Sequence, residues 1–75
     1  MSKRLSRREK QVWKLLSSGK TNQEIAWLLK ISVGTVKTYI RRLYFKLGVS
    51  SRVEAARLFE KLSTKGGLDL QDDKQ

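Results

Sequence analysis

Apolar side chains recur at helical spacing in four separate stretches of this chain. The longest stripe has members three or four residues apart, and it comprises Val36, Ile40, Leu43 and Leu47. A stripe of this period marks the buried face of an amphipathic helix. The shorter stripes are Val12, Leu15 and Leu16 beside Trp13, then Ile25, Ala26 and Leu29, and finally Ala55, Ala56, Phe59 and Leu62. The pattern predicts an all-α domain with helices over roughly residues 7–18, 22–29, 33–47 and 52–63.

Capping signals stand at the expected ends of these helices. A Ser or Thr followed three residues later by Glu can satisfy two backbone N–H groups at a helix start. The chain has three such capping boxes, at Ser6–Glu9, Thr21–Glu24 and Ser51–Glu54, and Ser32 is a suitable cap for the third helix. Gly48 follows the third helix, where a left-handed residue commonly ends a helix. The caps and the apolar period therefore predict the same four helices.

The connection between the second and third helices is short. Residues 30–32 separate the last apolar position of one helix, Leu29, from the start of the next, and Ile31 lies inside this turn. We expect Ile31 to plug the core. Such spacing is typical of a helix-turn-helix unit, whose second helix enters the major groove of DNA.

The chain is strongly basic, and its charge is unevenly distributed. Its 75 residues carry a formal net charge of +10, and the sequence pI is about 10.4. This is the electrostatic signature of a protein that binds a polyanion. After Lys65 come two glycines and an acidic remainder. We therefore expect one small domain over residues 1–65, followed by a flexible acidic tail over residues 66–75.

Composition argues against several other classes of function. The sequence has neither Cys nor His, so disulfides and the usual zinc and thiol chemistry are excluded. It also has no Gly-rich phosphate loop, and we expect neither an enzyme nor a bound metal or cofactor. Its apolar runs are far shorter than the ~20 residues that span a bilayer, and the N-terminus lacks the apolar core of a signal peptide. These features favour a cytoplasmic, nucleoid-associated protein that has no membrane partner.

The face of the third helix opposite its apolar stripe carries the candidate DNA-reading residues. Lys37, Thr38 and Arg41 project there at successive turns. Long cations can reach guanine O6 and N7 in the major groove, and a threonine methyl can meet thymine, so we predict base contacts for these three. The start of the same helix, at Ser32 and Gly34, can receive a phosphate on its free N–H groups.

Other polar residues are candidates for phosphate contacts. Four lie on one flank of the outward face of the third helix: Thr35, Tyr39, Arg42 and Lys46. Two more begin the second helix, where they could contact the backbone from across the groove: Lys20 and Asn22. For each of them the alternative is a side chain that is merely solvated.

Three stretches of the sequence resemble one family of regulators. They are residues 5–12 (LSRREKQV), 19–37 (GKTNQEIAWLLKISVGTVK) and 43–55 (LYFKLGVSSRVEA). Together they are similar to the LuxR/FixJ/GerE-type domain, and the resemblance covers roughly residues 5–62. It implies a four-helix fold, binding in the major groove of double-stranded DNA and regulation of transcription. It also places Lys37, Thr38 and Arg41 at the family's base-reading positions.

The sequence departs from the family at two positions of the third helix. Tyr39 stands where the family usually has His, and Phe45 where it often has Lys or Arg. The Phe45 ring could sit outside the groove, touch a sugar or pack on a partner, and these alternatives stay open. Trp27 and Leu28 lie outside the apolar stripe of the second helix, where they either form a partner surface or cover the edge of the core.

Partners and rival functions follow from the same residues. Val53 points away from the apolar face of the fourth helix and Leu58 lies at its edge, so two copies could pair there as a homodimer on DNA. A contact with RNA polymerase is also left open. One alternative function is a polymerase- and promoter-binding module like region 4 of sigma factors, although a capped fourth helix argues against it. Another is a basic amphipathic peptide that folds on anionic membranes.

Overall fold

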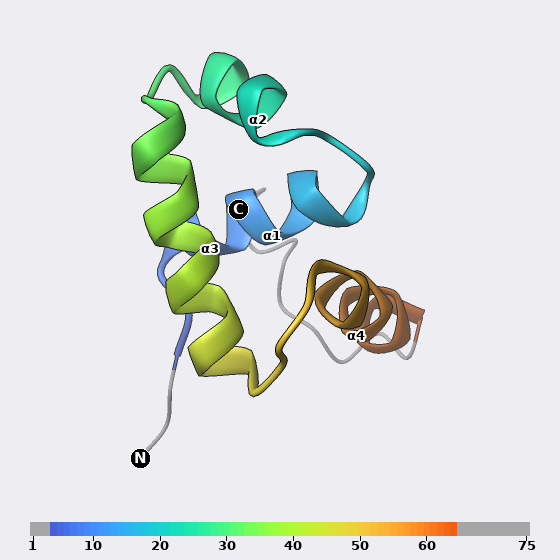
Figure 1. The fold of residues 1–75 in the computed structure, drawn as a ribbon. Coiled ribbons are helices and arrows are strands. Elements are labelled where there is room, and N and C mark those ends of the chain that lie inside the picture. The colour runs from blue at the N-terminus through green and yellow to red at the C-terminus, as the bar shows by residue number, and fades with distance from the viewer. Residues whose placement is uncertain (1–3, 65–75) are drawn as a thin grey trace.

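The protein folds into four helices connected by short loops (Figure 1). The computed structural model describes residues 4–64, and the predicted tail over residues 66–75 lies outside them. The helices are α1 (Arg7–Ser17), α2 (Asn22–Leu29), α3 (Val33–Leu47) and α4 (Arg52–Thr64). Their bounds agree with the predicted helices to within one residue, which confirms the all-α fold. None of the helices in the described part of the chain is long and apolar enough to cross a membrane.

Two of the three predicted capping boxes form completely. In the first, the amide of Glu9 donates to Ser6 Oγ (3.1 Å) and the amide of Ser6 donates to Glu9 Oε1 (2.8 Å). The box at the start of α2 has the same two bonds.

The third box forms only in half, which corrects the sequence-based expectation. The amide of Glu54 donates to Ser51 Oγ (3.1 Å), but Glu54 Oε1 accepts from the amide of Ser50 (2.8 Å), not from that of Ser51. The carboxylate therefore caps the chain one residue before the N-cap.

The turn between α2 and α3 is made by a left-handed residue. Lys30 has φ 60° and ψ 45°, and it reverses the chain at the end of α2. The amide of Ile31 then donates to the Ala26 carbonyl (3.0 Å), so the turn stays hydrogen-bonded to the helix it leaves. Ile31 is partly buried and packs against the core, as predicted. The result is a tight turn that fixes the direction of α3 relative to α2.

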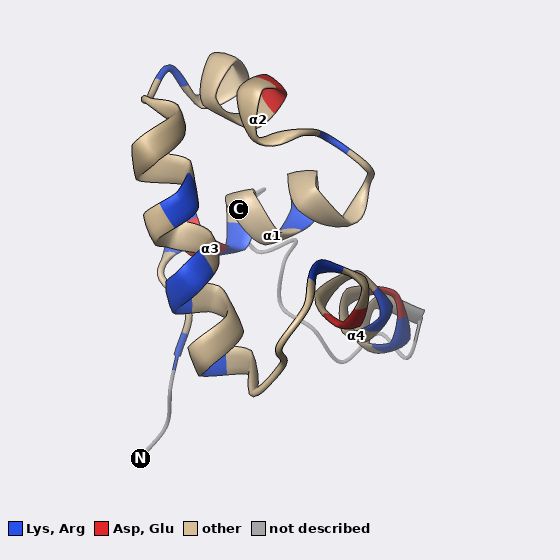
Figure 2. Ribbon diagram, viewed as in Figure 1, with Lys and Arg blue, Asp and Glu red and all other residues tan. Residues whose placement is uncertain are grey.

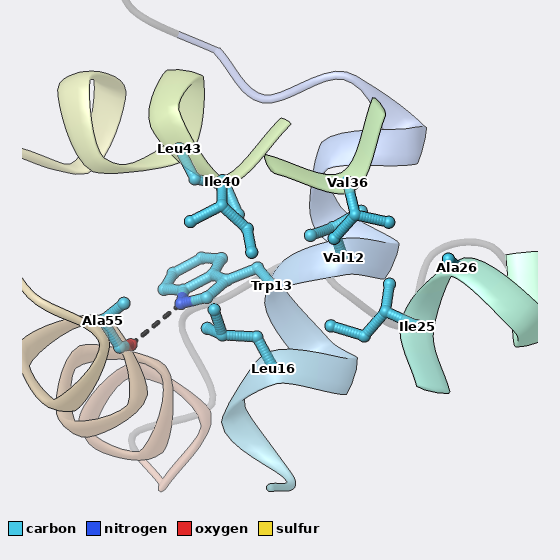
Figure 3. Close-up of a cluster of buried hydrophobic side chains, with 9 residues drawn as sticks. All are labelled: Val12, Trp13, Leu16, Ile25, Ala26, Val36, Ile40, Leu43 and Ala55. Carbon is cyan, nitrogen blue, oxygen red and sulfur yellow. Dashed lines mark hydrogen bonds between the residues drawn. The ribbon is translucent and has the colours of Figure 1, made fainter. Parts of the chain in front are cut away.

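The core surrounds α1, which packs against each of the other three helices. Figure 3 shows the buried side chains converging between these helices, with the Trp13 indole among them. The core comprises Val12, Trp13, Leu16, Ile25, Ala26, Val36, Ile40, Leu43 and Ala55. Burial of these apolar groups is the main source of stability in a domain of this size.

Trp13 joins α1 to α4 by a specific bond as well as by packing. Its side chain is 1% exposed, and Nε1 donates to the carbonyl oxygen of Ala55 over 2.9 Å (Figure 3). Its ring also meets Phe59 edge to face, with ring centroids 5.3 Å apart at 78°. An indole needs a partner for its N–H when it is buried, and here a helix carbonyl supplies it. The bond fixes where the fourth helix sits.

Candidate nucleic-acid interface

α2, its turn and α3 form a helix-turn-helix unit held against α1. One side of α3 is buried through Val36, Ile40 and Leu43, so the opposite side of this helix faces outward. In Figure 1, α3 runs along one flank of the molecule. The unit therefore presents a 15-residue helix along the surface.

The three predicted base-reading residues lie together on the outward side of α3. Lys37 and Arg41 are exposed and one helical turn apart, about 6 Å along the axis. Within residues 4–64, the structure shows no hydrogen bond or ion pair for either side chain. Thr38 is half-buried, and its Oγ1 donates to the carbonyl of Gly34 (3.2 Å), which holds its methyl in a fixed position. Both cations are therefore available to an external acceptor.

The charge of the unit is concentrated on this helix. α3 carries four Lys or Arg residues and no Asp or Glu. Figure 2 shows the basic residues recurring along α3, while the acidic residues lie on other helices. A surface of one sign attracts a ligand of the opposite sign and raises its association rate. The surface around α3 thus favours a polyanion.

The N-terminus of α3 keeps two amides outside the capping bonds. Ser32 Oγ accepts from the amide of Thr35 (3.0 Å), and the two hydroxyls are 2.9 Å apart. No bond is shown in the described residues for the amides of Val33 and Gly34, which point out of the helix start. A Cβ built on Gly34 would meet nothing closer than Ser32 Oγ at 3.8 Å. Nothing inside the domain therefore requires glycine at this position.

The start of α2 is held by a residue that the sequence analysis did not single out. Arg52, at the start of α4, donates from Nη1 to Asn22 Oδ1 (3.1 Å) and from Nη2 to the carbonyl of Lys20 (2.8 Å). The guanidinium thus ties α4 to the loop before α2, where it holds the backbone of Lys20 and the side chain of Asn22. It also adds a second positive charge, beside that of Lys20, at the edge of that loop.

The four residues on the flank of α3 that were predicted to contact phosphate differ in burial and in bonding. Arg42 and Thr35 are exposed, whereas Tyr39 is partly buried and packs against the core. Lys46 binds within the protein: its Nζ is 2.9 Å from Glu9 Oε1 and 3.3 Å from the carbonyl oxygen of Arg4. A phosphate contact by Lys46 stays a prediction. In the structure, the Lys46 side chain forms an ion pair with Glu9.

Among residues 4–64, Glu9 is a charged residue whose side chain is buried. Burial raises the pKa of its carboxyl, but the bond from Lys46 and the hydrogen bonds with Ser6 outweigh burial and hold the pKa below its ordinary value of 4.5. The ionised form therefore stabilises the folded domain at neutral pH. This stabilisation is lost as the pH falls below about 4.5, through the depressed folded-state pKa.

We expect Lys46→Met to shift acid unfolding to higher pH and to lower the free energy of unfolding at neutral pH by about 2 kcal/mol. The variant leaves the Glu9 carboxylate buried without its ammonium, so burial then raises its pKa. Urea unfolding followed by circular dichroism from neutral to acidic pH measures both changes.

A double variant provides the control for this ion pair. Adding Glu9→Gln to Lys46→Met removes the unpaired charge, so the double variant should be more stable at neutral pH than Lys46→Met alone. If Lys46→Met unfolds in acid at the same pH as the unmodified protein, the ion pair contributes nothing to stability.

Large apolar side chains are exposed on three of the helices. Trp27 is 79% exposed on α2, where Leu28 lies beside it, Phe45 is 72% exposed on α3, and Val53 is 62% exposed on α4. Leu58 is partly buried and packs against the core of its own domain. Trp27 therefore does not cover the edge of the core, and a partner surface remains the alternative for this side chain.

The fold and the outward basic helix define a DNA-binding domain of the helix-turn-helix class. The sequence model of one family, described as "Bacterial regulatory proteins, luxR family" (GerE), matches residues 3–65. This chain belongs to that family, which confirms the resemblance read from its motifs. It is accordingly a DNA-binding domain that acts in the regulation of transcription. No solved structure matches the chain.

Proposed function

We propose that the protein binds specific sequences of double-stranded DNA by inserting α3 into the major groove. The observation that carries the proposal is the pair Lys37 and Arg41, exposed at adjacent turns opposite the buried side of α3. Both can reach guanine O6 and N7 from there, with Thr38 between them on the same face. Regulation of transcription at such sites, on the bacterial nucleoid, would be the cellular outcome.

Phosphate contacts on both sides of the groove would hold α3 in place. On one side are the free amides at Val33 and Gly34, at the positive end of the helix dipole. On the other is the start of α2, where Arg52 holds Lys20 and Asn22. Arg42 reaches out from the exposed flank. Contacts of this kind set position and affinity but carry no sequence information.

Chemically altered duplexes test the groove assignment. Sequences are first selected from random duplexes, and their shared guanines are then replaced one at a time by 7-deazaguanine, which lacks the N7 acceptor in the major groove. We expect at least one replacement to weaken binding about tenfold, as measured by fluorescence anisotropy. Inosine at the same positions, which lacks only the minor-groove amino group, is the control and should bind normally.

The reverse result would show that the protein reads the minor groove. Selection that enriches no sequence, with affinity set by salt alone, would mean that the protein binds DNA without specificity. In either case the assignment of α3 as the reading helix would be wrong.

A homodimer on DNA is supported by the exposed Val53 on α4. It borders a shallow pocket between α1 and α4 whose lining residues include Ser17, Ala56 and Phe59. Two-fold pairing would favour half-sites spaced about 10 base pairs apart. Val53→Glu should weaken the binding of two chains to a two-site duplex, and unchanged affinity together with unchanged stoichiometry would exclude this surface. Leu58 is less suitable for the test, because it also packs on its own core. The contact with RNA polymerase stays a prediction.

A further inference from the structure

Phe45 lies on the outward face of α3, near the C-terminal end of this helix. It follows Arg41 by four residues and Thr38 by seven, so the three side chains share one side of the helix. Leu43, two positions away, is buried on the opposite side. Phe45 nevertheless exposes 72% of its surface to solvent. A large apolar ring thus lies in line with Thr38 and Arg41, two of the three residues expected to read bases.

The surroundings of Phe45 fit a nucleic acid better than a protein. Two of its neighbours along the helix, Arg41 and Arg42, are exposed cations, and α3 has no acidic residue. The other large apolar side chains exposed in the described part of the chain lie on α2 and α4. A protein interface needs roughly 800 Å² on each partner with an apolar centre, whereas a single ring among cations cannot provide one. A DNA duplex combines dense negative charge with isolated apolar groups.

The major groove offers one apolar group to such a ring. A guanine, adenine or cytosine presents hydrogen-bonding atoms there, and thymine adds a C5-methyl group. A phenyl ring has no donor or acceptor, so it can only favour the methyl. Placed against a cytosine amino group instead, the ring would remove water from that donor without replacing the hydrogen bond.

We propose that Phe45 is a specificity-determining residue that selects thymine through its C5-methyl group. The proposal rests on the proposed function, because it requires α3 to lie in the major groove. Four residues of helix span about 6 Å, so in the groove the Phe45 ring would lie next to the part of α3 that carries Arg41. The selected thymine therefore lies close to the base pair that Arg41 contacts.

Removal of single thymine methyls tests this directly. In a selected duplex, each thymine is replaced in turn by deoxyuridine, which pairs identically but lacks the methyl. We expect one position per half-site to weaken binding of the unmodified protein about fourfold, the effect of one buried methyl group. With Phe45→Ala, the same replacement should have no effect. Fluorescence anisotropy measures each affinity, and circular dichroism checks that the variant folds.

Two matched variants serve as controls. Phe45→Leu keeps an apolar side chain and should retain part of the sensitivity to deoxyuridine. Trp27→Ala removes the other exposed aromatic ring, on α2, and should leave the pattern of the unmodified protein.

The outcomes separate this inference from the one it rests on. If Phe45→Ala keeps the same sensitivity to deoxyuridine at every thymine, Phe45 does not read a methyl. If Phe45→Ala weakens binding to all duplexes alike, the ring packs on the sugar of the DNA backbone. If Phe45→Ala binds every duplex as the unmodified protein does, the ring contacts a protein or solvent. Each of these results overturns the proposal. In these cases 7-deazaguanine still weakens binding if α3 reads the groove, so the proposed function survives. If 7-deazaguanine also has no effect, both fail.

Discussion

Replacement of Trp13 by alanine is expected to remove most of the stability of the domain. The indole is 1% exposed, lies where α1 meets α4, and is a large part of a small core. Truncating a buried Trp costs about 3–5 kcal/mol through lost burial and the cavity left behind. A domain of this length is stable by roughly 3–9 kcal/mol in total. We expect Trp13→Ala to be substantially unfolded without denaturant, as judged by its far-ultraviolet circular dichroism.

Trp13→Phe separates the hydrogen bond from the packing. Phenylalanine keeps a ring against Phe59 but cannot donate to the Ala55 carbonyl, which the indole does over 2.9 Å. The loss should be about 2 kcal/mol, and urea unfolding measures it.

The other tryptophan provides the matched control. Trp27→Phe makes the same chemical change at a side chain that is 79% exposed, and it should alter stability by less than about 0.5 kcal/mol. Equal losses at the two positions would contradict the view that α4 is anchored through Trp13.

The four helices could be predicted because their signals are local. A capping box such as Ser6 with Glu9 involves residues three positions apart, and an apolar stripe repeats every three or four. Such interactions form within one helix, whatever the rest of the chain does. The outward face of α3 follows from the same stripe, since the side opposite Val36 and Leu43 must face away from the core.

The contacts between helices were not predictable in the same way. Glu9 and Lys46 are 37 positions apart, and each had a sufficient local explanation, as a helix cap and as a phosphate contact. Arg52 and the loop at Lys20 are 32 apart, and no periodicity links them. Trp13 lies beside the apolar stripe of its helix, yet it is buried because α4 closes over it. These pairings depend on how the helices pack, which the spacing along one helix does not determine.

The same distinction decides which residue tests base reading. We expect Arg41→Ala and Lys37→Ala to lose preference for a selected duplex over a scrambled one by about 5- to 150-fold, which corresponds to the ~1–3 kcal/mol of a good base contact. Both side chains are exposed and make no bond within the described residues, so neither change should disturb the fold. Fluorescence anisotropy with both duplexes at several salt concentrations measures affinity, preference and salt dependence together.

Arg42→Ala is the control, because Arg42 is an exposed arginine of the same helix that points toward the flank. Losing a phosphate contact there should weaken both duplexes alike and reduce the slope of log affinity against log salt by about one unit. Lys46 would be a poor control, since its removal also leaves the buried Glu9 without its ion pair. If Arg41→Ala weakened both duplexes equally while Arg42→Ala abolished the preference, α3 would be rotated in the groove, with its flank facing the bases. The Phe45 ring would then face the sugar-phosphate backbone and could not select thymine.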